Sequence, residues 1–79
     1  MRIQVFGPGC RRCHQALEAV QRAAAELGLA AEVEYVTDLR EIMAAGVIST
    51  PAVAVDGDVK VWGRVPTVED VKKMLREGS

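Results

Sequence analysis

Two cysteines three positions apart, Cys10 and Cys13, are the residues of this sequence best suited to chemistry. They follow a short apolar run and a Gly-Pro-Gly turn, and a helical pattern begins at the same place. Two thiols with this spacing at the start of a helix lie close enough to form a disulfide, and the first faces the positive end of the helix dipole. The pair therefore predicts electron transfer between thiols and disulfides.

The reacting species would be a thiolate, so the site has to lower the pKa of Cys10. Sites of the C-x-x-C type at helix N-termini reach pKa values of about 3.5–7.5. The backbone N–H groups of the first turn, the helix dipole and the positive charges of Arg11 and Arg12 all favour the ionised sulfur. Positive charge at this end of a helix weakens the helix itself, a conflict that makes sense if the arginines serve the thiolate.

Other interpretations of the pair are weaker. A purely structural disulfide would close a four-residue ring, which restrains little chain entropy. Structural zinc needs four ligands, and only Cys10, Cys13 and His14 are local, so we expect no metal. Residues 10–14 also match the C-x-x-C-H pattern of c-type haem attachment, but they lie inside a βαβ pattern in a chain without a visible export signal.

Length and composition indicate one compact domain over residues 1–79. Apolar residues make up 49% and charged residues 27% of the chain, and the formal net charge is −1. This composition lacks the basic excess of a nucleic-acid binder and a run long enough to span a membrane. We expect a cytoplasmic monomer, and in a reducing compartment an isolated cysteine pair is catalytic or metal-binding.

Hydrophobic periodicity and turn residues predict the element order β-α-β-α-β-β-α. The first two strands are joined through a helix and should be parallel, whereas Asp56-Gly57 predicts an antiparallel hairpin between the last two. The fold class is therefore α/β, a four-stranded mixed sheet covered by three helices. The expected elements are strands 1–6, 31–36, 52–55 and 58–62, and helices 11–27 and 39–45 and a last helix after residue 67.

Local details accompany these elements. Asp38 is expected to cap the second helix with Glu41 completing a capping box, and Thr67 to cap the last helix with Asp70 three residues on. Alternating glutamates in strand 31–36 indicate an edge strand with one wet face, and Trp62 is expected to pack on the hairpin. The expected buried stripe of the first helix is Cys13, Leu17, Val20, Ala24 and Leu27.

The element order, the C-x-x-C between the first strand and the first helix, and Thr50-Pro51 just before the third strand together resemble the thioredoxin/glutaredoxin superfamily. The closest likeness is to the small, single-domain redox-active disulfide proteins of archaea and bacteria. The resemblance covers almost the whole chain and implies a thioredoxin-like fold. It also implies thiol–disulfide oxidoreductase activity without a cofactor in the chain itself.

The resemblance also implies roles for individual residues. Cys10 matches the solvent-facing nucleophile, and Cys13 matches the more buried resolving cysteine. Pro51 matches the proline held in the cis form beside the disulfide. Thr50 matches the residue whose backbone pairs with an extended substrate segment, and Gly63 matches a glycine that lets the substrate backbone approach.

Several positions depart from the pattern. Gly9 replaces a tryptophan, and Arg11-Arg12 replace the Gly-Pro of thioredoxin. Gln4, which cannot ionise, replaces a buried aspartate that assists proton transfer. Residues 64–66 stand where glutaredoxins carry the paired aspartates that hold glutathione. The resemblance therefore gives neither the proton acceptor for Cys13 nor the use of glutathione.

These observations predict a small oxidoreductase that exchanges electrons with protein or low-molecular-weight disulfides through Cys10 and Cys13. Its reductase would be a flavoprotein or the glutathione system, and neither nucleic acid nor membrane is expected as a partner. Because Arg11 and Arg12 favour the thiolate, we expect a reduction potential above that of thioredoxin. Two alternatives remain, a module that binds a soft metal and a regulatory module of the same fold without turnover.

Overall fold

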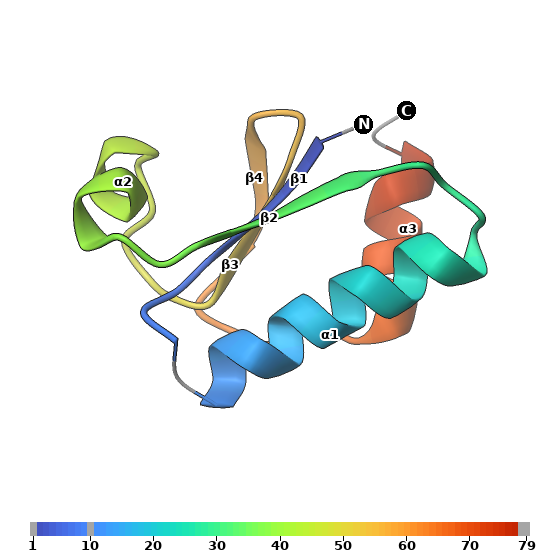
Figure 1. The fold of residues 1–79 in the computed structure, drawn as a ribbon, viewed down its shortest axis with the longest axis horizontal. Coiled ribbons are helices and arrows are strands. Elements are labelled where there is room, and N and C mark those ends of the chain that lie inside the picture. Colours follow the sequence, from blue (N-terminus) through green and yellow to red (C-terminus); the bar gives the residue numbers. More distant parts are fainter. Residues whose placement is uncertain (1, 10, 78–79) are drawn as a thin grey trace.

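The computed structural model describes residues 2–9 and 11–77 and contains the predicted seven elements in the predicted order (Figure 1). Their ends differ from the sequence prediction by at most about two residues, as is usual for element boundaries. The elements are β1 (Arg2–Phe6), α1 (Arg11–Glu26), β2 (Glu32–Val36), α2 (Leu39–Ala44), β3 (Ala52–Val55), β4 (Asp58–Trp62) and α3 (Val68–Glu77).

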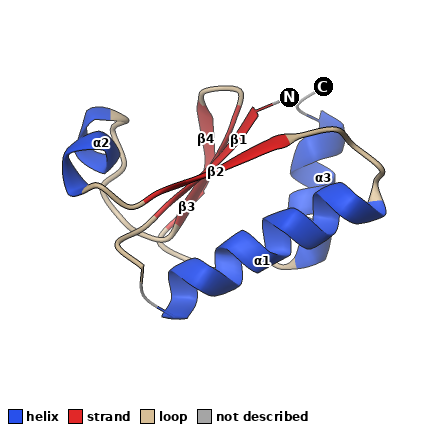
Figure 2. Ribbon diagram, in the orientation of Figure 1, coloured by secondary structure: helices blue, strands red, loops and turns tan. Residues whose placement is uncertain are grey.

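The strands form one mixed sheet in the order β2-β1-β3-β4 (Figure 2). Strand β1 pairs in parallel with β2 and antiparallel with β3, and β3 pairs antiparallel with β4. Asp56 and Gly57, with φ of 49° and 89°, make the turn between β3 and β4. Positive φ at both central residues is the requirement of a type I′ hairpin, so the predicted α/β fold and its hairpin are confirmed.

Two apolar cores lie on opposite faces of the sheet. Ile3 and Val5 of β1 belong to the larger core, together with buried residues of α1 and α3. Phe6 belongs to the smaller core, together with Ile42 of α2 and residues of β3. Helices α1 and α3 thus share one face and α2 covers the other, at the end of the sheet where β1 finishes (Figure 1). Because side chains alternate along a strand, β1 contributes to both cores.

The buried face of α1 is composed mainly of alanines. Besides Cys13 and Val20, its buried residues are Ala16, Ala19, Ala23 and Ala24. Leu17 and Leu27, which the predicted stripe included, are only partly buried, and the helix ends at Glu26. Small side chains let the helix lie close to the sheet and to α3, and interior packing density favours that arrangement.

Charged side chains mark both outer strands of the sheet. On β2, Glu34 accepts hydrogen bonds from Nε2 of Gln4 at 2.9 Å and from Nη2 of Arg2 at 3.2 Å. These two contacts, that of Gln4 first, lower the pKa of Glu34. On β4, Nζ of Lys60 lies 3.9 Å from the Asp58 carboxylate. The predicted wet face at the β2 edge is therefore confirmed.

A reciprocal capping box begins α3. The Thr67 N–H donates to Oδ2 of Asp70, the Asp70 N–H donates to Oγ1 of Thr67, and both distances are 3.1 Å. Arg64 Nη1 donates to the same carboxylate at 3.2 Å, which ties the loop after β4 to the helix. The hydrogen bond from the Thr67 backbone, followed by that from Arg64, lowers the pKa of Asp70.

The cap of α2 is simpler than expected. Asp38 is the N-cap, as predicted, but its carboxylate accepts from the N–H of Arg40 at 2.8 Å, at the second helical position and not the third. The expected capping box between Asp38 and Glu41 is therefore wrong, and the cap consists of the single hydrogen bond from the Arg40 N–H to Asp38. Among the described residues, no helix combines the length and the apolar character needed to cross a membrane.

We predict that Asp70→Asn destabilises the protein at neutral pH and makes its stability less sensitive to acid. The folded-state pKa of Asp70 lies below its ordinary value of 3.8, so the carboxylate's contribution is complete above that value and is lost as the pH falls through the lowered pKa. Urea unfolding from neutral to acidic pH should show the difference between the two proteins shrinking. Glu69→Gln, in the same helical turn but outside the capping box, is the control, and an equal effect there would contradict this assignment.

Candidate active site

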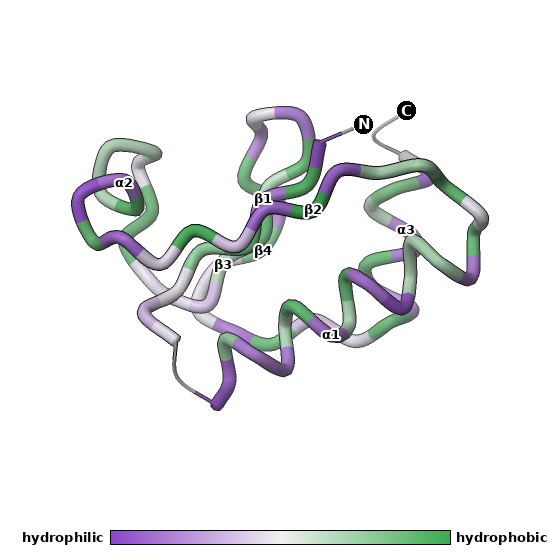
Figure 3. The backbone as a smooth tube through the Cα atoms, in the orientation of Figure 1, coloured by the Kyte–Doolittle hydropathy of each residue, from purple (hydrophilic) through white to green (hydrophobic). Residues whose placement is uncertain are grey.

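The turn between β1 and α1 carries the predicted chemistry. The Gly7 N–H donates to the carbonyl of Val36 at 3.0 Å, which continues the pairing of β1 with β2 by one residue. Helix α1 begins with the exposed residues Arg11 and Arg12, has no acidic residue in its first turn and is strongly hydrophilic at this end (Figure 3). Cys10 lies outside the described residues, so its contacts with the helix end stay a prediction.

Cys13 lies completely inside the protein. Its exposed fraction is 0%, which agrees with the burial expected for the second cysteine of the pair. The backbone of the turn lies directly against its side chain. A Cβ atom added to Gly7 would be 2.2 Å from Sγ of Cys13 and 2.8 Å from its Cβ. The sulfur of Cys13 therefore occupies the space that a side chain at Gly7 would need.

Pro51 and Gly63 form a second part of the site. The Thr50–Pro51 peptide bond is cis, Pro51 is buried and Thr50 is half-buried. The Gly63 N–H donates to the carbonyl of Pro51 at 3.0 Å. Gly63 has a φ of 78°, and a Cβ added there would lie 3.3 Å from Cβ of Ser49. The end of β4 is thus held against the segment that precedes β3.

Arg12 links the two parts of the site. Its Nη2 donates to the carbonyl of Gly63 at 3.5 Å, across 51 residues of sequence. Arg12, Gly63 and Pro51 are therefore joined by consecutive hydrogen bonds, whereas the Arg11 side chain is exposed. The structure brings the start of α1, the end of β4 and the segment before β3 to one end of the sheet.

An apolar hollow of about 290 Å³ lies beside this end of the sheet. Ile48 is 89% exposed, and Trp62, which we expected to pack on the hairpin, is 55% exposed. Ile48 precedes Thr50 by two residues, and Trp62 directly precedes Gly63. The hollow therefore adjoins both substrate-binding candidates. It is lined by Gly46, Val47, Ile48, Val59 and Trp62.

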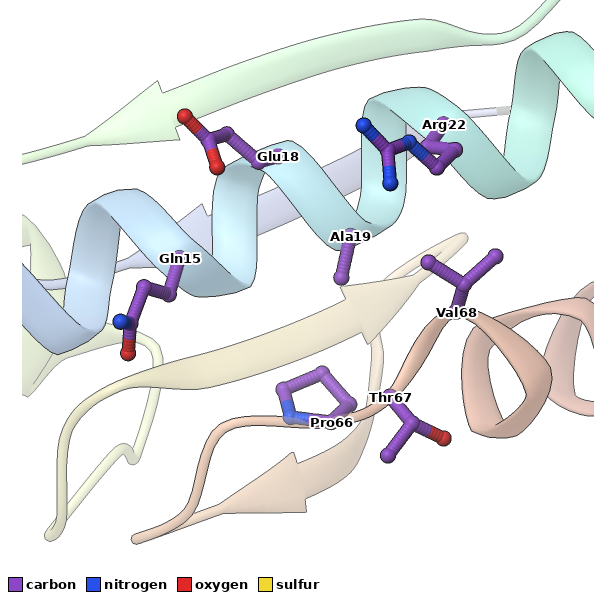
Figure 4. Close-up of a pocket in the computed structure, with 7 residues that line it drawn as sticks. All are labelled: Gln15, Glu18, Ala19, Arg22, Pro66, Thr67 and Val68. Atoms are coloured by element: carbon purple, nitrogen blue, oxygen red, sulfur yellow. The ribbon is translucent and has the colours of Figure 1, made fainter.

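A second hollow, of about 220 Å³, lies between α1 and the segment before α3 (Figure 4). The side chains of Gln15 and Glu18 point in different directions there, and none of the residues predicted for chemistry lines it. Its lining is Gln15, Glu18, Ala19, Arg22, Pro66, Thr67 and Val68.

Two further sequence candidates have contacts of their own. The ring of His14 is exposed and meets Tyr35 edge to face, with ring centres 5.6 Å apart. Gln4, at the position of the proton-transfer aspartate, donates to Glu34 on the wet face of the sheet. Within residues 2–9 and 11–77, no three His, Cys, Asp or Glu side chains are grouped in a way that could hold a metal ion.

Comparison with known proteins defines the class. The thioredoxin-domain family matches residues 1–76, and the chain belongs to this family of redox proteins. A thioredoxin of Methanothermobacter thermautotrophicus is 40% identical over 75 residues, covering 95% of this chain and 97% of the relative. A thioredoxin of Methanocaldococcus jannaschii is 45% identical over 74 residues, covering 94% of this chain and 85% of the relative. A second thioredoxin of that organism is 34% identical over 83 residues, covering 95% of this chain and 96% of the relative.

Sequence reasoning missed two features of the site. Gly7 was interpretable only as part of a turn, because its contact with Cys13 depends on how β1 and α1 pack. The exposure of Ile48 and Trp62 gave no sequence signal either, since both lie in patterns that also fit buried residues. A glycine directly after the strand is the one hint that the sequence contains.

We predict that Gly63→Ala lowers the free energy of unfolding by about 1–2 kcal/mol from backbone strain, because its φ of 78° disfavours residues with a side chain. The contact with Ser49 should add to this loss. Gly46→Ala supplies the strain alone, since Gly46 has a φ of 81° and a Cβ there meets nothing within 4 Å. Urea unfolding should show the larger loss for Gly63→Ala and removal of the excess by Ser49→Gly. Equal losses would refute the contact.

Proposed function

We propose that this protein is a small thiol–disulfide oxidoreductase that exchanges electrons with protein or low-molecular-weight disulfides through Cys10 and Cys13. The observation that carries the proposal is the burial of Cys13, 0% exposed, in the first turn of a helix that begins with two exposed arginines. Membership in the thioredoxin family supports the same chemistry. The hydrogen bonds from Arg12 to Gly63 and from Gly63 to Pro51 support a substrate-binding role for Gly63 and Pro51 near that helix.

The proposed reaction has two exchange steps. The Cys10 thiolate attacks one sulfur of the substrate disulfide, that S–S bond breaks, and the other substrate sulfur leaves and takes a proton. The Cys13 thiolate then attacks the Cys10 sulfur, the mixed disulfide breaks and the second substrate thiol is released. The substrate gains two electrons and two protons, and Cys10 and Cys13 become a disulfide. A flavoprotein reductase or glutathione returns the two electrons.

An extended segment of a substrate would lie along Thr50 and Gly63. The half-buried Thr50 offers backbone groups for pairing, and Gly63 has no side chain to hold a second backbone away. The exposed faces of Ile48 and Trp62 then supply apolar contact for residues next to the substrate disulfide. In this proposal the protein acts as a cytoplasmic monomer.

We predict that Cys10→Ser abolishes disulfide reduction, whereas Cys13→Ser performs only the first step and retains a mixed disulfide. The reason is that each variant removes the nucleophile of one step. Insulin reduction measures turnover, and mass spectrometry under non-reducing conditions detects the trapped adduct. Turnover that survives both substitutions would sink the proposal, and stoichiometric metal retained through reducing purification would favour a soft-metal carrier instead.

We also predict a reduction potential above the value of about −270 mV typical of thioredoxin. Arg11→Gln combined with Arg12→Gln should raise the pKa of Cys10 and lower the potential, because neutral side chains no longer favour the thiolate. Redox equilibrium with glutathione and the pH dependence of alkylation measure the two quantities. Arg22→Gln, farther along the same helix, is the control. A wild-type potential well below that of thioredoxin would contradict the prediction.

A further inference from the structure

We propose that Gly7 is a positioning residue for the second exchange step, because its lack of a side chain leaves the space that the Cys13 sulfur occupies. This inference rests on the proposed function. Gly7 is buried, and a Cβ added to it would lie 2.2 Å from Sγ and 2.8 Å from Cβ of Cys13. Real Cβ atoms do not approach other atoms so closely, so any side chain at this position must displace Cys13 or the turn.

Neither side of this contact can move away freely. Gly7 continues β1, and its N–H is hydrogen-bonded at 3.0 Å to the carbonyl of Val36 in β2. Cys13 belongs to α1, whose Ala16 and Val20 are 0% exposed in the larger core. The sulfur is therefore held between a paired strand end and a packed helix, and its position is fixed by both.

Backbone conformation does not explain the glycine at this position. Among the glycines that the structure describes, those with positive φ are Gly9, Gly28, Gly46, Gly57 and Gly63, and Gly7 is not one of them. A residue with a side chain could therefore adopt the backbone conformation of Gly7 without the strain of the left-handed region. The two closest atoms that a side chain at Gly7 would meet belong to the Cys13 side chain, and this contact accounts for the glycine.

The position of the Cys13 sulfur matters for only one of the two steps. The first step needs the Cys10 sulfur and the substrate disulfide. In the second step the Cys13 thiolate forms a bond to the Cys10 sulfur while the bond from Cys10 to the substrate breaks, and this displacement requires the sulfur atoms to be aligned. A misplacement of about 1 Å can reduce the rate of such a step about 10²-fold.

Gly7→Ala should therefore separate the two steps. With an equimolar amount of the aromatic disulfide dithiobis(nitrobenzoic acid), attack by Cys10 releases one coloured thionitrobenzoate and attack by Cys13 releases the second. We expect the first release to keep the wild-type rate and the second to slow by about 10²-fold. Gly28→Ala is the matched control, because Gly28 has a φ of 65° and an open Cβ position far along the chain from the cysteines. A wild-type second phase in Gly7→Ala would overturn the inference.

A stability measurement tests the same contact without turnover. In a double-mutant cycle, Gly7→Ala should lower the thermal midpoint much more when Cys13 is present than in the Cys13→Gly background, where both the sulfur and the Cβ atom that it would meet are gone. If Gly7→Ala does not fold alone, folding restored by Cys13→Gly supports the inference, and an equal loss in both backgrounds overturns it. Absence of the first release in the wild-type protein would instead refute the proposed function, and the cycle would still decide the role of Gly7.

Discussion

The contact between the backbone of Gly7 and the sulfur of Cys13 is the constraint on which the rest of the site depends. It joins the end of the central strand β1 to the first turn of α1 with no space between them. The strand is held by neighbours on both sides, and the helix is held by an alanine-rich buried face. The position of the Cys13 sulfur is thus fixed by the packing of α1 against the sheet.

The positive charges at the start of α1 destabilise the helix and favour a cysteine thiolate beside it. Arg11 and Arg12 at the N-terminus of α1 repel the positive end of its dipole, and the first turn contains no carboxylate to offset them. The helix tolerates this because tertiary packing supplies most of the stability of helices in proteins. Arg12 also reaches the carbonyl of Gly63, so the same side chain contributes charge and connects two loops.

Much of the fold could be predicted from the sequence because its signals are local. Apolar periodicity, the Asp56-Gly57 turn and the Thr67 cap each depend on residues near one another in the chain, and each is found in the structure. The positions of Leu17 and Trp62 were harder to predict. Periodicity gives the face of an element but not how deeply that face is buried, which is decided by the size of the residues packed opposite.

In the site too, some features follow from the local sequence and others depend on packing. The sequence indicated Cys13, Pro51 and Gly63 as members of one site, and the structure places Gly63 in hydrogen-bond contact with Pro51. The closeness of Gly7 to Cys13 depends on the angle at which a helix leaves a strand. No spacing rule in the sequence encodes that angle, because a turn of the same length can direct the helix in several ways.

The charges on the outer strands also govern how copies of the chain meet. A sheet with two open edges can grow by accepting a strand from another molecule, which is the route to fibrils and to aggregates. Here a second β2 laid along the first would bring Glu32 and Glu34 against their own counterparts, and β4 presents Asp58 and Lys60 at the opposite edge. Along a seam between two β2 strands these like charges would face each other and disfavour that stacking.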